Sequence, residues 1–168
     1  KRVVSLNKMK AVNKWNNSLA LPCLEQPHSD LSVLKTSFLL PPVVDSKPTL
    51  VLDLDETLVH CFDESEAPSS SSRIITVLGQ DMWISVRPFT NLFLSVLADH
   101  FELVVWTAGT EEYGQAVLHL LDPDCKFIQH SLFRQHCTPR ANGTYIKDLS
   151  RLGRDHRVRL CDNMEPSF

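Results

Sequence analysis

The chain has 168 residues, of which 43% are apolar and 22% charged, as expected for a globular domain with a sizeable core. A net charge of −3 gives no reason to expect direct binding to nucleic acid. The five cysteines are scattered and contain no C-x-x-C pair, which argues against a disulfide framework and favours a reducing compartment. No apolar run reaches the ~18–20 residues that a transmembrane helix needs.

Residues 1–46 predict a basic polar arm and linker. Five lysines and arginines precede the first acid, Glu25, and the double proline at 41–42 argues against regular structure there. No apolar segment of the kind found in secretory signals follows the basic start. An acid-poor arm is also found in mitochondrial presequences, so that alternative stays open.

The rest of the chain, residues 47–168, alternates predicted strands and helices. The apolar run 49–53 predicts a buried parallel strand. Residues 63–72 predict a solvated loop, and 74–78 with 82–86 predict a small hairpin that turns at 79–81. The later elements are expected at 90–101 (helix), 103–106 (strand), 111–121 (helix), 145–147 (extended), 148–152 (helical turn) and 156–161 (third core strand). This order predicts a parallel sheet covered on both faces.

Two acids, Asp53 and Asp55, follow the first predicted strand. Side chains at i and i+2 share one face of an extended chain, and ligands of open α/β sheets bind beyond the carboxyl ends of strands. Such a carboxylate pair is suited to holding a hard cation, attacking an electrophile, or supplying a proton to a poor leaving group.

Alternatives to this interpretation are a calcium loop and helix capping. Counted from Asp53, an EF-hand loop has its acid at Glu64 but carries Leu58 where glycine is required. Asp55 or Thr57 could instead cap a following helix.

The cysteines suggest two further alternatives. His60-Cys61 and His136-Cys137 resemble the start of a tyrosine-phosphatase loop but lack its arginine six residues later, so that rival fails. A zinc site made by His130, His136, Cys125 and Cys137 lacks paired ligand spacing.

Four segments in order resemble the haloacid dehalogenase superfamily of phosphatases, in the branch that acts on the C-terminal domain of RNA polymerase II and related phosphoserine substrates. They are residues 50–60 (LVLDLDETLVH), 104–108 (VVWTA), 145–155 (YIKDLSRLGRD) and 162–163 (DN). The resemblance implies an α/β, Rossmann-like three-layer sandwich with a central parallel sheet, a small β-hairpin insertion and no large cap domain. Relative to this branch the domain is expected to be incomplete at its C-terminus.

The resemblance also implies roles for single residues. Asp53 would be the nucleophile that forms an aspartyl-phosphate, and Asp55 the general acid and base. Thr107 would hydrogen-bond a phosphate oxygen, and Lys147 would neutralise charge on the transferring group. Other implied positions are Mg²⁺ ligands (Asp53, the main-chain oxygen of Asp55, Asn163, with Asp162 beside them) and substrate contacts (Arg134, Tyr113).

The spacing between motifs bears on the substrate. The segments from Thr57 to Thr107 and from Thr107 to Asp162 have no room for a lid domain, so the site suits a phosphorylated serine or threonine on an extended protein segment, such as the polymerase domain. We expect a nuclear, monomeric enzyme by analogy, with a cytoplasmic or mitochondrial location left open. The alternatives are a catalytically impaired scaffold or translocase-type subunit and a small-metabolite hydrolase, which the lack of a lid disfavours.

Overall fold

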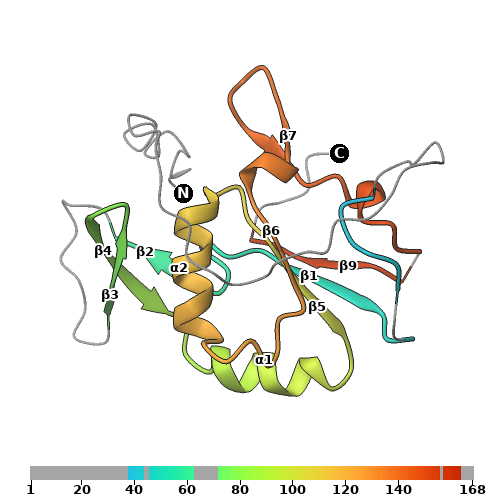
Figure 1. Ribbon diagram of the computed structural model, residues 1–168, viewed down its shortest axis with the longest axis horizontal. Coiled ribbons are helices and arrows are strands. Elements are labelled where there is room, and N and C mark those ends of the chain that lie inside the picture. Colours follow the sequence, from blue (N-terminus) through green and yellow to red (C-terminus); the bar gives the residue numbers. More distant parts are fainter. Residues whose placement is uncertain (1–37, 44–45, 63–71, 156, 164–168) are drawn as a thin grey trace, which may run out of the picture. The chain divides into compact units, whose positions relative to one another are not determined.

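The central sheet of the computed structural model is parallel (Figure 1), as the sequence predicts. The structure describes residues 38–43, 46–62, 72–155 and 157–163. Its described strands run in the order β6-β5-β1-β9. Neighbouring strands pair in parallel throughout. Their bounds are β1 (Thr49–Leu52), β5 (Glu102–Trp106), β6 (His130–Leu132) and β9 (Arg159–Cys161).

The middle strands β1 and β5 are buried on both faces. Val51 pairs with Val104 on one face, where Trp106, Leu40 and Leu152 complete an apolar cluster. On the other face Leu52, Leu103 and Val105 are also fully buried, and Leu50 is half-buried. Figure 1 shows α1 (Thr90–Ala98) below the sheet and the short 3-10 turn η3 (Leu149–Leu152) above it. These layers make the fold an α/β, Rossmann-like arrangement.

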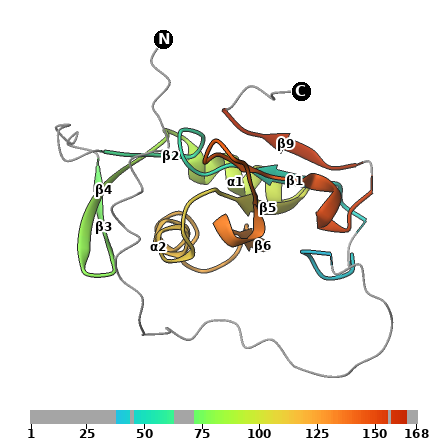
Figure 2. The ribbon, with the colours of Figure 1, turned by 90° about the horizontal axis from the view of Figure 1, so that it is seen from above.

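Helix α2 (Glu111–Leu121) has the bounds that the sequence predicts. Thr110 caps it, since its hydroxyl accepts the Tyr113 N–H. In Figures 1 and 2 the helix lies between the β-hairpin insertion and the strands β5 and β6. Helix α1 ends at Ala98, three residues before the predicted end at Phe101. The N–H groups of His100 and Phe101 both donate to the Leu97 carbonyl, which closes the last turn.

The predicted hairpin is present, but its turn lies elsewhere. The strands β3 (Arg73–Val77) and β4 (Gln80–Val86) pair so that Val77 faces Gln80, which leaves Leu78 and Gly79 as the turn. Both turn residues have positive φ, the conformation of a two-residue hairpin turn. Gln80 and Asp81, predicted as turn, therefore belong to the strand. A third antiparallel strand, β2 (Val59–Cys61), pairs with β4.

The predicted third core strand is parallel but not buried. All three residues of β9 are exposed, and β9 lies at the edge of the described sheet, where it pairs with β1 alone. Within the described residues β9 is therefore an exposed strand and not the buried core strand that the sequence predicts, and the alternating charged residues Arg157 and Arg159 fit this exposure.

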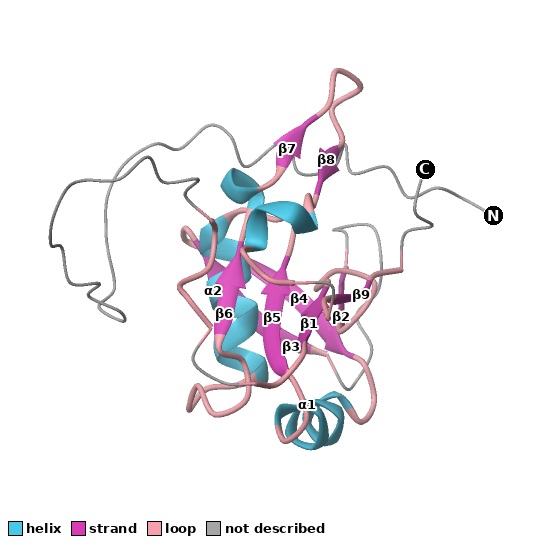
Figure 3. Cartoon of the chain, turned by 90° about the vertical axis from the view of Figure 1, so that its right-hand side faces the viewer, coloured by secondary structure: helices cyan, strands magenta, loops and turns pink. Residues whose placement is uncertain are grey.

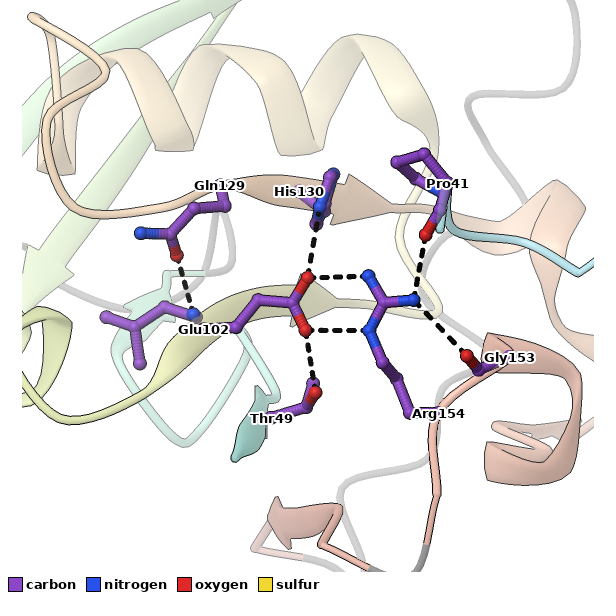
Figure 4. A network of polar contacts seen from close by, with 8 residues as sticks. Pro41, Thr49, Glu102, Gln129, His130, Gly153 and Arg154 are labelled. Atoms are coloured by element: carbon purple, nitrogen blue, oxygen red, sulfur yellow. Dashed lines mark hydrogen bonds and ion pairs between the residues drawn. The ribbon is translucent and has the colours of Figure 1, made fainter. Parts of the chain in front are cut away.

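A polar network fixes the amino end of the sheet (Figure 4). The guanidinium of Arg154 donates to both carboxylate oxygens of Glu102 at 2.8 and 2.6 Å, and also to the carbonyl of Pro41. The Thr49 hydroxyl donates to the same carboxylate, at 2.6 Å, and His130 lies 3.3 Å from it. These bonds join β1, β5, β6 and the segment before β1.

The packed chain thus begins before residue 47. Leu40, predicted as part of the linker, is 6% exposed, and the Leu39 N–H donates to the Arg151 carbonyl. Residues 1–37 lie outside the described residues, so the arm stays a prediction. No helix among the described residues has the length and apolar character to cross a membrane.

Candidate active site

Three of the predicted site residues directly follow parallel strands. Asp53 follows β1, Thr107 follows β5 and Asp162 follows β9, and the three strands are neighbours in the sheet. The Asp53 N–H donates to Cys161 and the Thr107 N–H to Leu132, which extends the strand pairing to the edge of the site. Figure 3 shows the small ladder of β7 (Thr138–Pro139) and β8 (Tyr145–Ile146) beyond these strand ends. Lys147 follows β8 directly.

A tight loop carries the chain from Asp53 to β2. The Leu54 carbonyl accepts three N–H groups, those of residues 57, 58 and 59, and Glu56 has positive φ. Arg87 holds the loop from outside by donating to the carbonyls of Glu56 and Thr57 at 2.9 and 2.5 Å. No helix follows Asp55 or Thr57, so the capping alternative is wrong; Glu64 of the calcium-loop alternative lies outside the described residues.

Asp53, Lys147 and Asp162 form one charged cluster. The Lys147 ammonium lies 2.6 Å from Asp53 Oδ1 and 2.7 Å from Asp162 Oδ2. Each of the three side chains is only 10–11% exposed. Burial raises the pKa of Asp53, an effect that Lys147 opposes and that the negative charge of Asp162 reinforces. The net result is a pKa of Asp53 raised to about 6, with Lys147 limiting the rise that burial causes.

Asp55, Thr107 and Tyr113 form a second cluster. The Tyr113 hydroxyl donates to Asp55 Oδ1 at 2.5 Å, and the Thr107 hydroxyl donates to Asp55 Oδ2 at 3.1 Å. Burial raises the pKa of Asp55, while the two hydroxyl hydrogen bonds and the charge of Lys147 lower it. Burial, with the nearby Asp55 charge, also raises the pKa of Tyr113, so the phenol stays protonated and remains a donor.

The remaining predicted site residues lie in different surroundings. Arg134 donates through Nε to the Ala108 carbonyl at 2.7 Å and packs over the Tyr145 ring at 5.3 Å. Asn163 is exposed and lines a cavity of 380 Å³ with Asp162 and the first turn of α1.

The zinc alternative finds no support in the described part of the chain. Cys125 is exposed, Cys137 is buried, and His136 accepts the Phe133 N–H instead of facing a metal. No group of three or more His, Cys, Asp or Glu side chains in the described residues has the arrangement of metal ligands. The structure forms no disulfide among the four described cysteines, Cys61, Cys125, Cys137 and Cys161.

Sequence reasoning missed two residues that shape the site. Gly109 donates its N–H to the Thr107 hydroxyl at 2.9 Å, and a Cβ there would lie 3.0 Å from the Tyr113 ring. The glycine two residues after the strand end was the available signal. Arg87 gave no sequence signal, because its contact with residues 56 and 57 depends on how the hairpin insertion folds back onto that loop.

Comparison with known proteins agrees with this fold and motif set. Residues 48–168 match the family model of the NLI interacting factor-like phosphatases. The chain is 40% identical over 126 residues to the CTD small phosphatase-like protein 3 of Caenorhabditis elegans, covering 71% of this chain and 42% of that protein. It is 36% identical over 133 residues to the CTD nuclear envelope phosphatase 1 homolog of Drosophila melanogaster, covering 73% of this chain and 54% of that protein.

Among solved structures, that of Fcp1, an essential RNA polymerase II CTD phosphatase, superposes with a TM-score of 0.55 at 23% identity. The match covers 68% of this chain and 37% of that chain, and it supports the fold. The domain thus has the α/β fold of that structure. The chain belongs to the NLI interacting factor-like phosphatase family, and spans about half or less of the length of the relatives described above.

Proposed function

We propose that the protein is a Mg²⁺-dependent protein serine/threonine phosphatase that works through an aspartyl-phosphate. The observation that carries the proposal is the pairing of two clusters at one sheet edge. Asp53 lies beside a cation, Lys147, and Asp55 is held by two hydroxyl groups. One carboxylate is thus suited to attack and the other to proton transfer.

In the first step the Asp53 carboxylate oxygen attacks phosphorus, and the bond from phosphorus to the serine oxygen breaks. The electron pair of that bond goes to the serine oxygen, which takes a proton from Asp55. In the second step Asp55 removes a proton from water, the water oxygen attacks phosphorus, and inorganic phosphate leaves Asp53. Lys147 offsets the negative charge that gathers around the transferring group.

The donor set fits a hard divalent cation. Asp53 and Asp162 present carboxylate oxygens that converge on the same ammonium group, which supports their ability to share one cation. The Asp55 side chain faces Thr107 and Tyr113, so only its main-chain oxygen would be a ligand, with the Asn163 amide as a further oxygen donor. Bound Mg²⁺ would supply charge stabilisation for the phosphoryl oxygens.

A protein segment is the proposed substrate. The names of the relatives identify them as CTD phosphatases, and the described additions to the central sheet are the small β2-β4-β3 sheet and the short β7–β8 ladder, with no lid domain among them. We therefore propose the phosphorylated C-terminal domain of RNA polymerase II, or a related phosphoprotein, as substrate and the nucleus as location. The alternative is a scaffold or translocase-type subunit, which the retention of Asp53, Asp55 and Lys147 disfavours.

Hydrolysis of a phosphoserine peptide by the purified chain tests the proposal. We expect phosphate release that requires Mg²⁺ and is lost in Asp53→Asn, with phosphate trapped on the wild-type chain after acid quench. Folded wild-type protein that releases no phosphate from peptide or p-nitrophenyl phosphate with Mg²⁺ would favour the scaffold. Faster turnover of sugar phosphates than of phosphopeptides would favour the metabolite hydrolase.

A further inference from the structure

Both carboxylate oxygens of Asp55 accept hydrogen bonds from hydroxyl groups, an arrangement here named the hydroxyl clamp. The clamp consists of Tyr113, whose hydroxyl lies 2.5 Å from Oδ1, and Thr107, whose hydroxyl lies 3.1 Å from Oδ2. Two donors on opposite oxygens fix the plane of a carboxyl group as well as its position.

The direction of these bonds is set by the surrounding chain. The Thr107 hydroxyl already accepts the Gly109 N–H at 2.9 Å, so its single proton points to Asp55. Tyr113 is 2% exposed and donates to Asp55 from inside the protein. Asp55 therefore accepts from both hydroxyls. Each of its carboxylate oxygens keeps a second lone pair, which can carry the proton that Asp55 exchanges with a substrate.

The clamp is held by close packing. A side chain at Gly109 would lie 3.0 Å from the Tyr113 ring and 3.1 Å from the Thr107 hydroxyl, so the absent side chain is what lets these groups approach. Tyr113 lies in the first turn of α2, and a Cβ on its neighbour Gly114 would lie 2.6 Å from the Phe133 ring. A side chain supported on several sides holds its partner in one geometry.

We propose that Tyr113 is a positioning residue that holds the Asp55 carboxyl in line for proton transfer to the leaving oxygen, which lets this site cleave esters of aliphatic alcohols such as serine. The inference rests on the proposed function and assigns Tyr113 a role other than the substrate contact expected from the sequence. Its hydroxyl bonds to Asp55, so it acts through that residue.

The leaving group decides how much this positioning matters. A serine alkoxide is a very poor leaving group and needs the proton as the phosphorus–oxygen bond breaks, whereas p-nitrophenolate leaves without one. Loss of the Tyr113 hydroxyl should therefore slow phosphoserine cleavage by roughly 100-fold and p-nitrophenyl phosphate cleavage by roughly 10-fold or less, within the range of general acid catalysis.

The experiment measures kcat/KM of the full chain with Mg²⁺ for a series of aryl phosphates of increasing leaving-group pKa and for a phosphoserine peptide. Tyr113→Phe is compared with wild type, and Tyr145→Phe, which removes the other tyrosine hydroxyl of the chain, is the matched control. We expect a steeper dependence on leaving-group pKa in Tyr113→Phe and the wild-type slope in Tyr145→Phe. Circular dichroism checks that each variant folds.

A double-mutant cycle with Asp55→Asn gives the second measurement. Once Asp55 no longer transfers protons, Tyr113→Phe should add no further dependence on the leaving group. The positioning role would be overturned if Tyr113→Phe lowered kcat/KM equally for every aryl phosphate, or if the losses of the two single variants added in the double variant. Either result leaves the phosphatase proposal standing. The proposed function itself would be overturned if wild-type protein hydrolysed no phosphate ester, or if Asp53→Asn hydrolysed them as fast as wild type.

Discussion

Lys147 forms an ion pair with Asp53, and its ammonium lies 2.6 Å from Asp53 Oδ1 although the two residues belong to distant segments of the chain. The same ammonium lies 2.7 Å from Asp162, so one cation holds two acids that follow neighbouring strands. Because all three groups are nearly buried, removal of the lysine leaves two carboxylates facing each other with little water to separate their charges.

Lys147→Met should therefore reduce both activity and stability. We expect kcat/KM to fall at least 100-fold, a transition-state cost of about 3 kcal/mol. We also expect a loss of unfolding free energy of about 3 kcal/mol, since one partner of a buried ion-pair cluster is gone. Steady-state kinetics and urea unfolding would measure the two effects.

The matched control for that variant is Lys126→Met. Lys126 pairs with Asp124 on the surface, where both side chains are more than 60% exposed, so its loss should change neither quantity measurably. A Lys147→Met protein with wild-type stability would show that the cluster seen around Asp53 does not hold the fold together.

Thr107 gives a prediction that separates a hydroxyl from a methyl group. Thr107→Val removes the donor to Asp55 and the acceptor of the Gly109 N–H, and the site is fully buried, so we expect a loss of about 1–3 kcal/mol in unfolding free energy. Thr107→Ser keeps the hydroxyl and should retain most of the activity, whereas Thr107→Val should lose roughly 10- to 100-fold. Equal activity in the two variants would argue against a role for the hydroxyl.

The fold was largely predictable, because its central elements carry clear apolar periodicity. The strands β1 and β5 and the helix α2 were expected close to their observed bounds. The predicted position of the hairpin turn was wrong. The observed turn places Leu78 at positive φ, a conformation that a leucine in the sequence does not indicate. β6 was not predicted. It is only three residues long and begins with the polar His130, which contacts Glu102, so it contains no apolar run that periodicity could detect.

The structure brings several of the predicted site residues close together, but the contacts among them were not predictable from the sequence. Motif order indicated Asp53, Asp55, Thr107 and Lys147, and the strand ends bring Asp53 and Thr107 to one edge. That Thr107 and Tyr113 both donate to Asp55 depends on the loop at 107–110 and on α2 packing against it, which local sequence patterns do not encode.

Gly114 offers a test of that packing. Alanine is favoured over glycine in a helix by about 0.8–1 kcal/mol, yet a Cβ at Gly114 would lie 2.6 Å from the ring of the buried Phe133. Overpacking costs typically 1–3 kcal/mol, so after the helix gain is subtracted we expect Gly114→Ala to destabilise the protein by up to about 2 kcal/mol in urea unfolding. Gln115→Ala, exposed on the same helix, should stay within about 0.5 kcal/mol. A stabilised Gly114→Ala would mean that α2 can move away from Phe133 at little cost.

Glu102 makes stability depend on acid pH. The hydrogen bonds from Arg154 lower the pKa of Glu102 from 4.5 to about 2. Because the unfolded chain takes up this proton first, the stabilisation is fully present above about pH 4.5 and is lost as pH falls toward 2. The contribution should be on the order of 2 kcal/mol once solvent screening of this partly exposed pair is allowed for.

Urea unfolding of wild type and Glu102→Gln between pH 6 and pH 2.5 measures that contribution. The amide cannot titrate, so the variant should be less stable at pH 6, and the gap should narrow as the pH falls, because wild type alone loses the Glu102 contribution. Arg154 is 4% exposed, so part of the deficit at pH 6 reflects a buried guanidinium without its carboxylate, and that part should persist at low pH. Parallel stability curves across the whole range would show that Glu102 keeps its ordinary pKa in the folded protein and that the network at the amino end of the sheet contributes through packing alone.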